Sequence, residues 1–85
     1  MKISVVIPVF NELESLPDLV EELKINLNNF KDWEVIFVDD GSSDKSNNWL
    51  FKLSNENDNF KLIQFFRNYG KSAALSEGFK NAKGD

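Results

Sequence analysis

The sequence predicts an α/β fold with a Rossmann-like parallel sheet, in the order strand, helix, strand, helix, strand, helix. Apolar strand-like runs alternate three times with segments whose apolar residues recur at helical spacing. The run from Val35 through Val38 contains no polar residue, which is typical of a strand buried on both faces of a parallel sheet. Repeated strand–helix units of this length form parallel sheets with right-handed crossovers.

The first strand is expected over Ile3–Val9, and Pro8 marks its end because proline cannot donate a hydrogen bond to a neighbouring strand. The first helix is expected over residues 16–28, with Ser15 as its N-cap. Its apolar residues recur at helical spacing and should pack on the sheet: Leu16, Leu19, Val20, Leu23 and Leu27.

The second strand is expected over residues 33–39, and a glycine-serine turn follows it. The second helix is expected over residues 45–56, capped by Ser43 or Asp44. Its apolar face consists of Trp49, Leu50 and Leu53. Polar turn-forming residues from 55 to 59 then predict a loop.

The third strand is expected over Phe60–Phe65 and the third helix over residues 71–82. The residues expected to face inward from this helix are Ala73, Ala74, Leu75, Gly78 and Phe79. Glycine inside a helix costs roughly 1 kcal/mol relative to alanine, so Gly78 indicates close packing of the helix on the sheet. Another strand would be due after residue 85, so we expect residues 1–85 to be the N-terminal part of a larger α/β domain.

Composition excludes several classes of function. The net charge of −4 argues against binding to a nucleic-acid backbone, which requires a basic surface. The chain has no cysteine and no histidine, so disulfides, zinc–thiolate sites and histidine bases are excluded within it. No signal peptide and no apolar run of membrane-spanning length is visible. We therefore expect a cytoplasmic segment.

Acidic residues follow the first two strands of the predicted sheet. Asp39 and Asp40 end the second strand, and Asn11 and Glu12 follow the first. The carboxyl edge of such a sheet is where open α/β folds bind ligands. Adjacent strand residues point to opposite faces, so one aspartate is a candidate to accept a base N–H and the other to bond backbone amides of the turn. The alternative is that Asp39 and Asp40 are turn and capping residues and that Asn11 and Glu12 begin the next helix.

A third polar cluster opens the last helix: Arg67, Asn68, Tyr69, Gly70, Lys71 and Ser72. Backbone N–H groups at a helix start, with Arg67 and Lys71, favour a pyrophosphate. The alternative for Lys71 is a solvated lysine or an ion-pair partner for a rim acid. A P-loop is excluded because Phe65 stands where its first glycine is required.

Three motifs in register strongly resemble the start of family 2 glycosyltransferases: VVIPVFNE, VIFVDDGSSD and RNYGKSAALSEGFKNAKGD. The branch they most resemble contains dolichyl-phosphate mannosyltransferases and bactoprenol glucosyltransferases. The resemblance implies the A-type glycosyltransferase fold and a nucleotide-sugar site. The residues that it implies for this site are Pro8, Phe10, Glu12, Val38, Asp40 and Lys71. Phe10 stands where the family often has tyrosine, so stacking is kept and a hydroxyl is lost.

The resemblance further implies an inverting enzyme that transfers a hexose from a UDP- or GDP-sugar to an acceptor, with polyprenyl phosphate as the expected acceptor. Such an enzyme would act in cell-envelope glycan synthesis and associate with the cytoplasmic face of the membrane through downstream segments. Its Mg²⁺ or Mn²⁺ ligands and its general base would lie outside residues 1–85, so this segment alone should lack catalysis.

Two alternatives belong to other classes of protein: a receiver-like signalling domain and a non-catalytic nucleotide-binding module. A receiver carries its acceptor aspartate at the end of the third strand, where this chain has Phe65. We also expect the segment to self-associate, because in the family's sheet the first strand is central. Without a later strand beside it, residues 5–9 form an exposed apolar edge.

Overall fold

Three parallel strands form the sheet in the computed structural model of the chain, which describes residues 2–65 and 70–82. The strands are β1 (Ile3–Val9), β2 (Trp33–Asp40) and β3 (Phe60–Phe65), and their order is β1-β2-β3. In register, β2 places Val35 between Val5 of β1 and Phe60 of β3. The predicted bounds of β1 and β3 are confirmed, and β2 extends one residue further than predicted, to Asp40.

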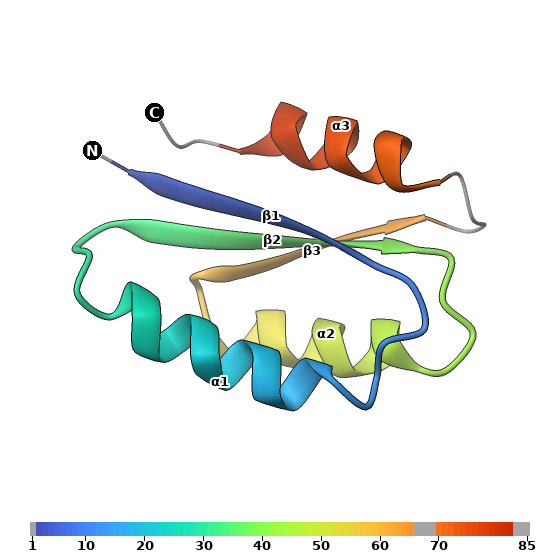
Figure 1. Cartoon of the computed structure of the whole chain (residues 1–85), viewed down its shortest axis with the longest axis horizontal. Helices are drawn as coiled ribbons and strands as arrows, with labels where there is room; N and C mark the ends of the chain where they lie inside the picture. The colour runs from blue at the N-terminus through green and yellow to red at the C-terminus, as the bar shows by residue number, and fades with distance from the viewer. Residues whose placement is uncertain (1, 66–69, 83–85) are drawn as a thin grey trace.

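Helices cover both faces of this sheet (Figure 1). Helices α1 (Leu16–Leu27) and α2 (Ser46–Glu56) lie on one face, and α3 (Lys71–Asn81) lies on the other, against β1 and β2. The predicted α/β order of three strand–helix units is therefore confirmed. None of the described helices is long and apolar enough to cross a membrane.

The strand β2 lies at the centre of two apolar clusters because its side chains alternate between the faces. Val35 and Phe37 point into the cluster beneath α1 and α2, whose other buried members are Val9, Leu16, Val20, Leu27, Leu50 and Phe60. Ile36 and Val38 point into the cluster beneath α3, together with Ala74. The prediction that this strand is buried on both faces is confirmed.

Small residues bring α3 close to the sheet. Ala74 and Gly78 are buried one turn apart, and a methyl group added at Gly78 would lie 2.2 Å from Val6 Cγ1. Close packing at Gly78 is therefore confirmed. The prediction that Phe79 faces inward was wrong, since its side chain is 65% exposed. Successive helix residues are rotated by about 100°. Because Gly78 faces the sheet, the next residue, Phe79, points away from it.

The helix starts differ from the predicted caps in their bonding. Ser15 precedes α1, but its hydroxyl donates to the Glu12 carbonyl at 3.2 Å and does not accept a helix amide. Lys45 precedes α2 in the left-handed conformation, at φ 72°, and α2 begins one residue later than predicted. Asp44 still serves this helix start, because its Oδ1 accepts the Ser46 amide at 3.0 Å.

Candidate functional site

Five of the six predicted site residues lie in or just after the last residues of β1 and β2: Pro8, Phe10, Glu12, Val38 and Asp40. Pro8 lies opposite Val38 in register. Side chains two apart on a strand share a face, so Asp40 follows Val38 toward the side of the sheet that α3 covers. Asp39 follows Phe37 toward the side that α1 and α2 cover. The prediction that the two aspartates point to opposite faces is therefore confirmed.

Asp40 connects the end of β2 to the start of α3. Its side chain is nearly buried, with 4% of the residue exposed, and its Oδ2 accepts the Gly70 amide at 2.9 Å. Gly70 precedes α3 and adopts φ 99°, a backbone conformation that residues other than glycine rarely adopt. A carboxylate at a helix N-terminus is also stabilised by the helix dipole. One amide that was expected to serve a pyrophosphate is thus bonded to Asp40.

Asp39 holds the turn after β2. Its Oδ1 accepts the Ser42 amide at 3.2 Å, as predicted for one of the two aspartates. Its Oδ2 is buried and has no hydrogen-bond partner among residues 2–65 and 70–82. The residue is 1% exposed, so its contribution is to the turn and not to a solvent-accessible surface.

Side chains join the loop after β1 to the loop after β2. The Asn11 amide donates to Ser42 Oγ at 2.9 Å, and Asn11 Oδ1 accepts the Ser43 amide at 2.7 Å. The Leu13 amide donates to Asp44 Oδ2 at 3.0 Å. We call this set of contacts between residues 11–13 and 42–44 the loop clasp. It fixes the two loops to each other across about thirty residues of chain.

Asp44 supplies the charged part of the loop clasp. A hydrogen bond from the Ser46 hydroxyl lowers the pKa of the Asp44 carboxyl, and the backbone amides of Leu13 and Ser46 lower it further. Burial acts in the opposite direction and is outweighed. The carboxylate therefore remains ionised at neutral pH while it bonds to groups from both loops.

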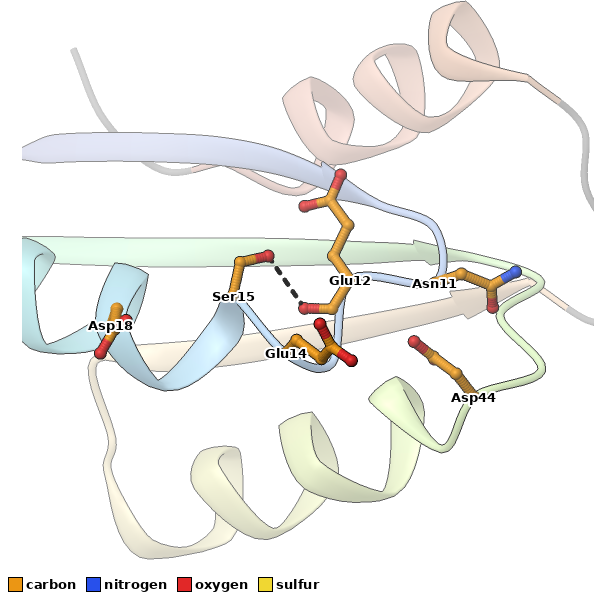
Figure 2. Close-up of a pocket in the computed structure, with 6 residues that line it drawn as sticks. All are labelled: Asn11, Glu12, Glu14, Ser15, Asp18 and Asp44. Atoms are coloured by element: carbon orange, nitrogen blue, oxygen red, sulfur yellow. Dashed lines mark hydrogen bonds between the residues drawn. The ribbon is translucent and has the colours of Figure 1, made fainter.

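An open hollow of about 600 Å³ lies beside the loop clasp, lined by Asn11, Glu12, Glu14, Ser15, Asp18 and Asp44. Figure 2 shows the Glu12 carboxylate directed away from those of Glu14, Asp18 and Asp44, toward the side of the sheet that α3 covers. Among the predicted site residues whose side chains the structure describes, Glu12 alone lines this hollow. The carboxylates of Glu14, Asp18 and Asp44 repel a diphosphate, so the hollow does not match the predicted nucleotide site.

The remaining predicted residues differ in their accessibility. Phe10 is 45% exposed beside the loop clasp and is available for stacking. Val38 is fully buried beneath Gly78, so its side chain does not reach solvent. The Lys71 backbone opens α3, but its side chain lies outside the described structure, as do Arg67, Asn68 and Tyr69.

A divalent metal does not fit the part of the chain that the structure describes. No three acidic side chains among residues 2–65 and 70–82 come together in a group that could hold an ion. The expected Mg²⁺ or Mn²⁺ was assigned to ligands outside this segment, and that assignment stays a prediction.

Sequence reasoning missed the contacts of Asn11 and Ser42. Asn11 adopts a left-handed conformation, with φ 51°, which asparagine tolerates better than most residues. The short sequence Phe10-Asn11-Glu12 after a strand-ending proline was a signal for such a turn. Its partner in the second loop, about thirty residues away, had no signal in the sequence.

Comparison with known proteins matches residues 4–85 to the family described as glycosyl transferase family 2. A curated relative from Salmonella paratyphi B, undecaprenyl-phosphate 4-deoxy-4-formamido-L-arabinose transferase, is 45% identical over 86 aligned residues. The alignment covers 99% of this chain and 26% of the relative, and the same protein from Salmonella newport matches equally. The chain thus spans about a quarter of the length of these relatives.

Several solved structures have the same fold. TarS 1–349 from S. aureus superposes with a TM-score of 0.83 at 30% identity, over 99% of this chain and 25% of that one. The same protein has been solved in complex with UDP. Mannosyltransferase PcManGT from Pyrobaculum calidifontis, in complex with GDP-Man and Mn²⁺, gives a TM-score of 0.81 at 21% identity and covers 96% of this chain and 24% of its own, which supports the fold alone. With its A-type fold and a family match over nearly its whole length, this chain belongs to glycosyl transferase family 2.

Proposed function

We propose that residues 1–85 are the nucleotide-sugar-binding N-terminal segment of an inverting glycosyltransferase. The nucleotide would lie at the carboxyl edge of the sheet, on the side that α3 covers. The six residues assigned to it are Pro8, Phe10, Glu12, Val38, Asp40 and Lys71. In this assignment Asp40 accepts a base N–H, Phe10 stacks, and Glu12 accepts hydrogen bonds from the ribose.

One observation carries this proposal. Pro8, Val38 and Asp40 come from two strands and share one side of one sheet edge, and the Glu12 carboxylate is directed to that side (Figure 2). Lys71 opens α3 beside Gly70, whose amide bonds to Asp40. Because the ligand crevice of open α/β sheets lies outside the carboxyl ends of the strands, this is where a nucleotide is expected.

Burial and hydrogen bonding limit how two of these residues could contact a nucleotide. Val38 is buried, so any contact with the base would come from its backbone and not from its side chain. Asp40 already accepts the Gly70 amide, so a base N–H would share the carboxylate with the start of α3. Binding of the base and the position of α3 would then be coupled through one side chain.

The intact enzyme would transfer a hexose from a UDP- or GDP-sugar to a polyprenyl phosphate. The acceptor oxygen would attack the anomeric carbon as the bond to the nucleoside diphosphate breaks, which inverts that carbon. The 45% identical transferase whose name includes undecaprenyl phosphate supports this acceptor. We further propose that this transfer belongs to cell-envelope glycan synthesis at the cytoplasmic face of the membrane, with membrane contact through segments other than residues 1–85.

Calorimetric titration of the 85-residue chain with UDP and with GDP tests the proposal. We expect saturable heat with one or both nucleotides. Asp40→Asn should weaken binding roughly tenfold or more, since a lost bond to a charged group contributes about 1.5–3 kcal/mol. Asp58→Asn is the matched control, because Asp58 is exposed in the loop before β3, away from the carboxyl edge.

Negligible heat with both nucleotides would contradict nucleotide binding by this segment. Equal affinities of the chain and of Asp40→Asn would contradict the role of that carboxylate while leaving nucleotide binding in place. If the chain binds a nucleotide but the intact protein transfers no sugar, the non-catalytic module remains. The family match over residues 4–85 decides against a receiver domain.

A further inference from the structure

We propose that Asn11 is a positioning residue for the nucleotide site, acting through the loop clasp to hold Phe10 and Glu12 in place relative to Asp40. This inference rests on the proposed function and deepens it. Asn11 is a residue to which the sequence motifs assign no ligand contact. The structure gives it bonds from both its backbone and its side chain to the neighbouring loop.

Asn11 is fixed from two directions. Its backbone amide donates to Ser42 Oγ at 2.9 Å, and its side-chain Oδ1 accepts the Ser43 amide at 2.7 Å and lies 3.5 Å from the Ser43 hydroxyl oxygen. Both bonds reach residues more than thirty positions away in the sequence. The backbone and the side chain of Asn11 therefore both help to set the separation of the two loops, together with the bond from Leu13 to Asp44.

The backbone conformation of Asn11 determines where its neighbours point. At φ 51°, the chain turns sharply between Phe10 and Glu12. A left-handed residue other than glycine costs energy and persists where surrounding contacts hold it. Without the bonds from Ser42 and Ser43, the loop would lose the contacts that hold this turn. Phe10 and Glu12 would then sample several orientations.

Hydrogen bonds in the second loop link Asn11 to the end of β2, where Asp40 lies. Ser42, which accepts the Asn11 amide, also donates its own amide to Asp39 Oδ1 at 3.2 Å. Asp39 and Asp40 are adjacent at the end of β2. The Asn11 amide is thus linked to Asp40, the proposed base-binding residue, through three groups. These are the Ser42 hydroxyl, the Ser42 amide bonded to Asp39, and the peptide unit between Asp39 and Asp40. A preorganised site binds more tightly because less ordering is needed on binding.

The decisive variant is Asn11→Gly. Glycine accepts a positive φ without strain, so the backbone turn stays accessible while the Oδ1 acceptor is lost. We expect the dissociation constant for UDP or GDP to rise roughly tenfold, which corresponds to about 1.4 kcal/mol. Calorimetry measures it at a temperature where circular dichroism shows the variant fully folded. A merely structural role would lower the melting temperature and leave the dissociation constant unchanged under those conditions.

Asn11→Asp provides the conservative rescue. Aspartate keeps an acceptor oxygen for the Ser43 amide and tolerates the same backbone conformation. We expect hydrogen exchange of the Ser43 amide to speed up in Asn11→Gly and to stay slow in Asn11→Asp. Affinity for uridine or guanosine should be restored in Asn11→Asp, because nucleosides carry no phosphate to repel the added charge. Asn29→Gly is the matched control, since Asn29 is exposed at the opposite end of the sheet.

The outcomes separate this inference from the proposed function. If the unaltered chain binds no nucleotide, the proposed function fails and the positioning role fails with it. If the chain binds and Asn11→Gly binds equally well, the positioning role is overturned while nucleotide binding stands. If Asn11→Gly and Asn29→Gly weaken binding to the same extent, the effect is general loosening, which also overturns it. A selective loss with Asn11→Gly, restored for nucleosides by Asn11→Asp, supports it.

Discussion

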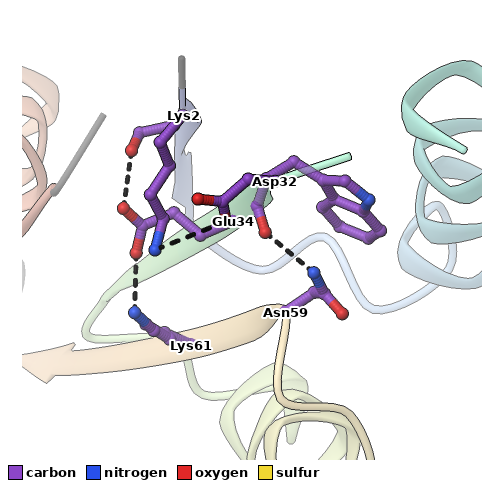
Figure 3. Close-up of polar contacts among 7 residues, drawn as sticks. Lys2, Asp32, Glu34, Asn59 and Lys61 are labelled. Atoms are coloured by element: carbon purple, nitrogen blue, oxygen red, sulfur yellow. Dashed lines mark hydrogen bonds and ion pairs between the residues drawn. The ribbon is translucent and has the colours of Figure 1, made fainter. Parts of the chain in front are cut away.

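The two edges of the sheet hold their acidic residues in different ways. At the amino edge, Glu34 is 1% exposed and bonds to Lys61 Nζ at 2.7 Å and to Ser4 Oγ at 2.6 Å (Figure 3). Asp32 lies 3.9 Å from Lys2. A buried carboxylate is thus balanced there by a lysine and a hydroxyl. This arrangement joins all three strands and stabilises the sheet itself.

At the carboxyl edge, backbone amides hold the acids. Asp39 accepts the Ser42 amide, Asp40 the Gly70 amide, and Asp44 those of Leu13 and Ser46. Backbone N–H groups fix the direction of these carboxylates at the ends of the loops and at the start of α3. The same residue types thus serve the stability of the sheet at one edge and the positioning of loops and a helix start at the other.

The largest expected effect is at the amino edge. Lys61→Met should lower the free energy of unfolding by about 2–3 kcal/mol, because it removes the partner of a buried carboxylate. Chemical denaturation monitored by circular dichroism measures the change. Lys80→Met is the control, since Lys80 pairs with Glu77 at 4.0 Å on the surface and should contribute under 1 kcal/mol. If both substitutions lowered the free energy of unfolding equally, the ion pair at the amino edge would stabilise the chain no more than an exposed surface pair.

Gly78→Ala tests how closely α3 packs on the sheet. Alanine favours the helix by roughly 1 kcal/mol over glycine, yet its methyl would lie 2.2 Å from Val6 Cγ1 and 3.2 Å from Val38 Cγ2. We expect net destabilisation of about 1–2 kcal/mol by overpacking. Denaturant midpoints of Gly78→Ala and of Ser76→Ala, an exposed position on the same helix, provide the comparison. A stabilised Gly78→Ala variant would show that α3 is not held closely against β1 and β2.

The chain studied alone should self-associate. Within the described structure β1 pairs with β2 and forms one edge of the sheet, and its apolar residues and backbone groups there invite pairing with a second chain. Size-exclusion chromatography over a concentration series should show a shift to larger species. Val5→Lys should reduce the shift, because charged residues protect edge strands. A sharp monomer peak at all concentrations would contradict the prediction.

The smallest effect is the pH dependence of the loop clasp. Bonds from Ser46 and Leu13 lower the pKa of Asp44 in the folded chain. The stabilisation from this shift is therefore complete above about pH 4, the ordinary range of an aspartate, and is lost as the pH falls through the lower folded pKa. Asp44→Asn should remove this acid dependence. Melting temperatures of both proteins between pH 6 and pH 2 measure it, and parallel curves would exclude Asp44 as the source.

The sequence alone determined the elements and their burial. Segments rich in apolar residues predicted the bounds of β1 and β3, and helical spacing identified the inward side of α1. These features depend on local periodicity, which a single chain displays directly. The face of α3 was only partly predictable, because Leu75, Gly78 and Phe79 are all apolar and only close packing selected Ala74 and Gly78.

Only the tertiary structure decided the partners at the carboxyl edge. The bonds from Asn11 to the second loop and from Gly70 to Asp40 join residues about thirty positions apart. Their existence depends on the parallel order of the strands and on where each loop ends, which no local pattern encodes. Polar side chains in loops have several energetically similar partners, whereas apolar residues have one common destination. For that reason the core followed from the sequence and the arrangement of the site did not.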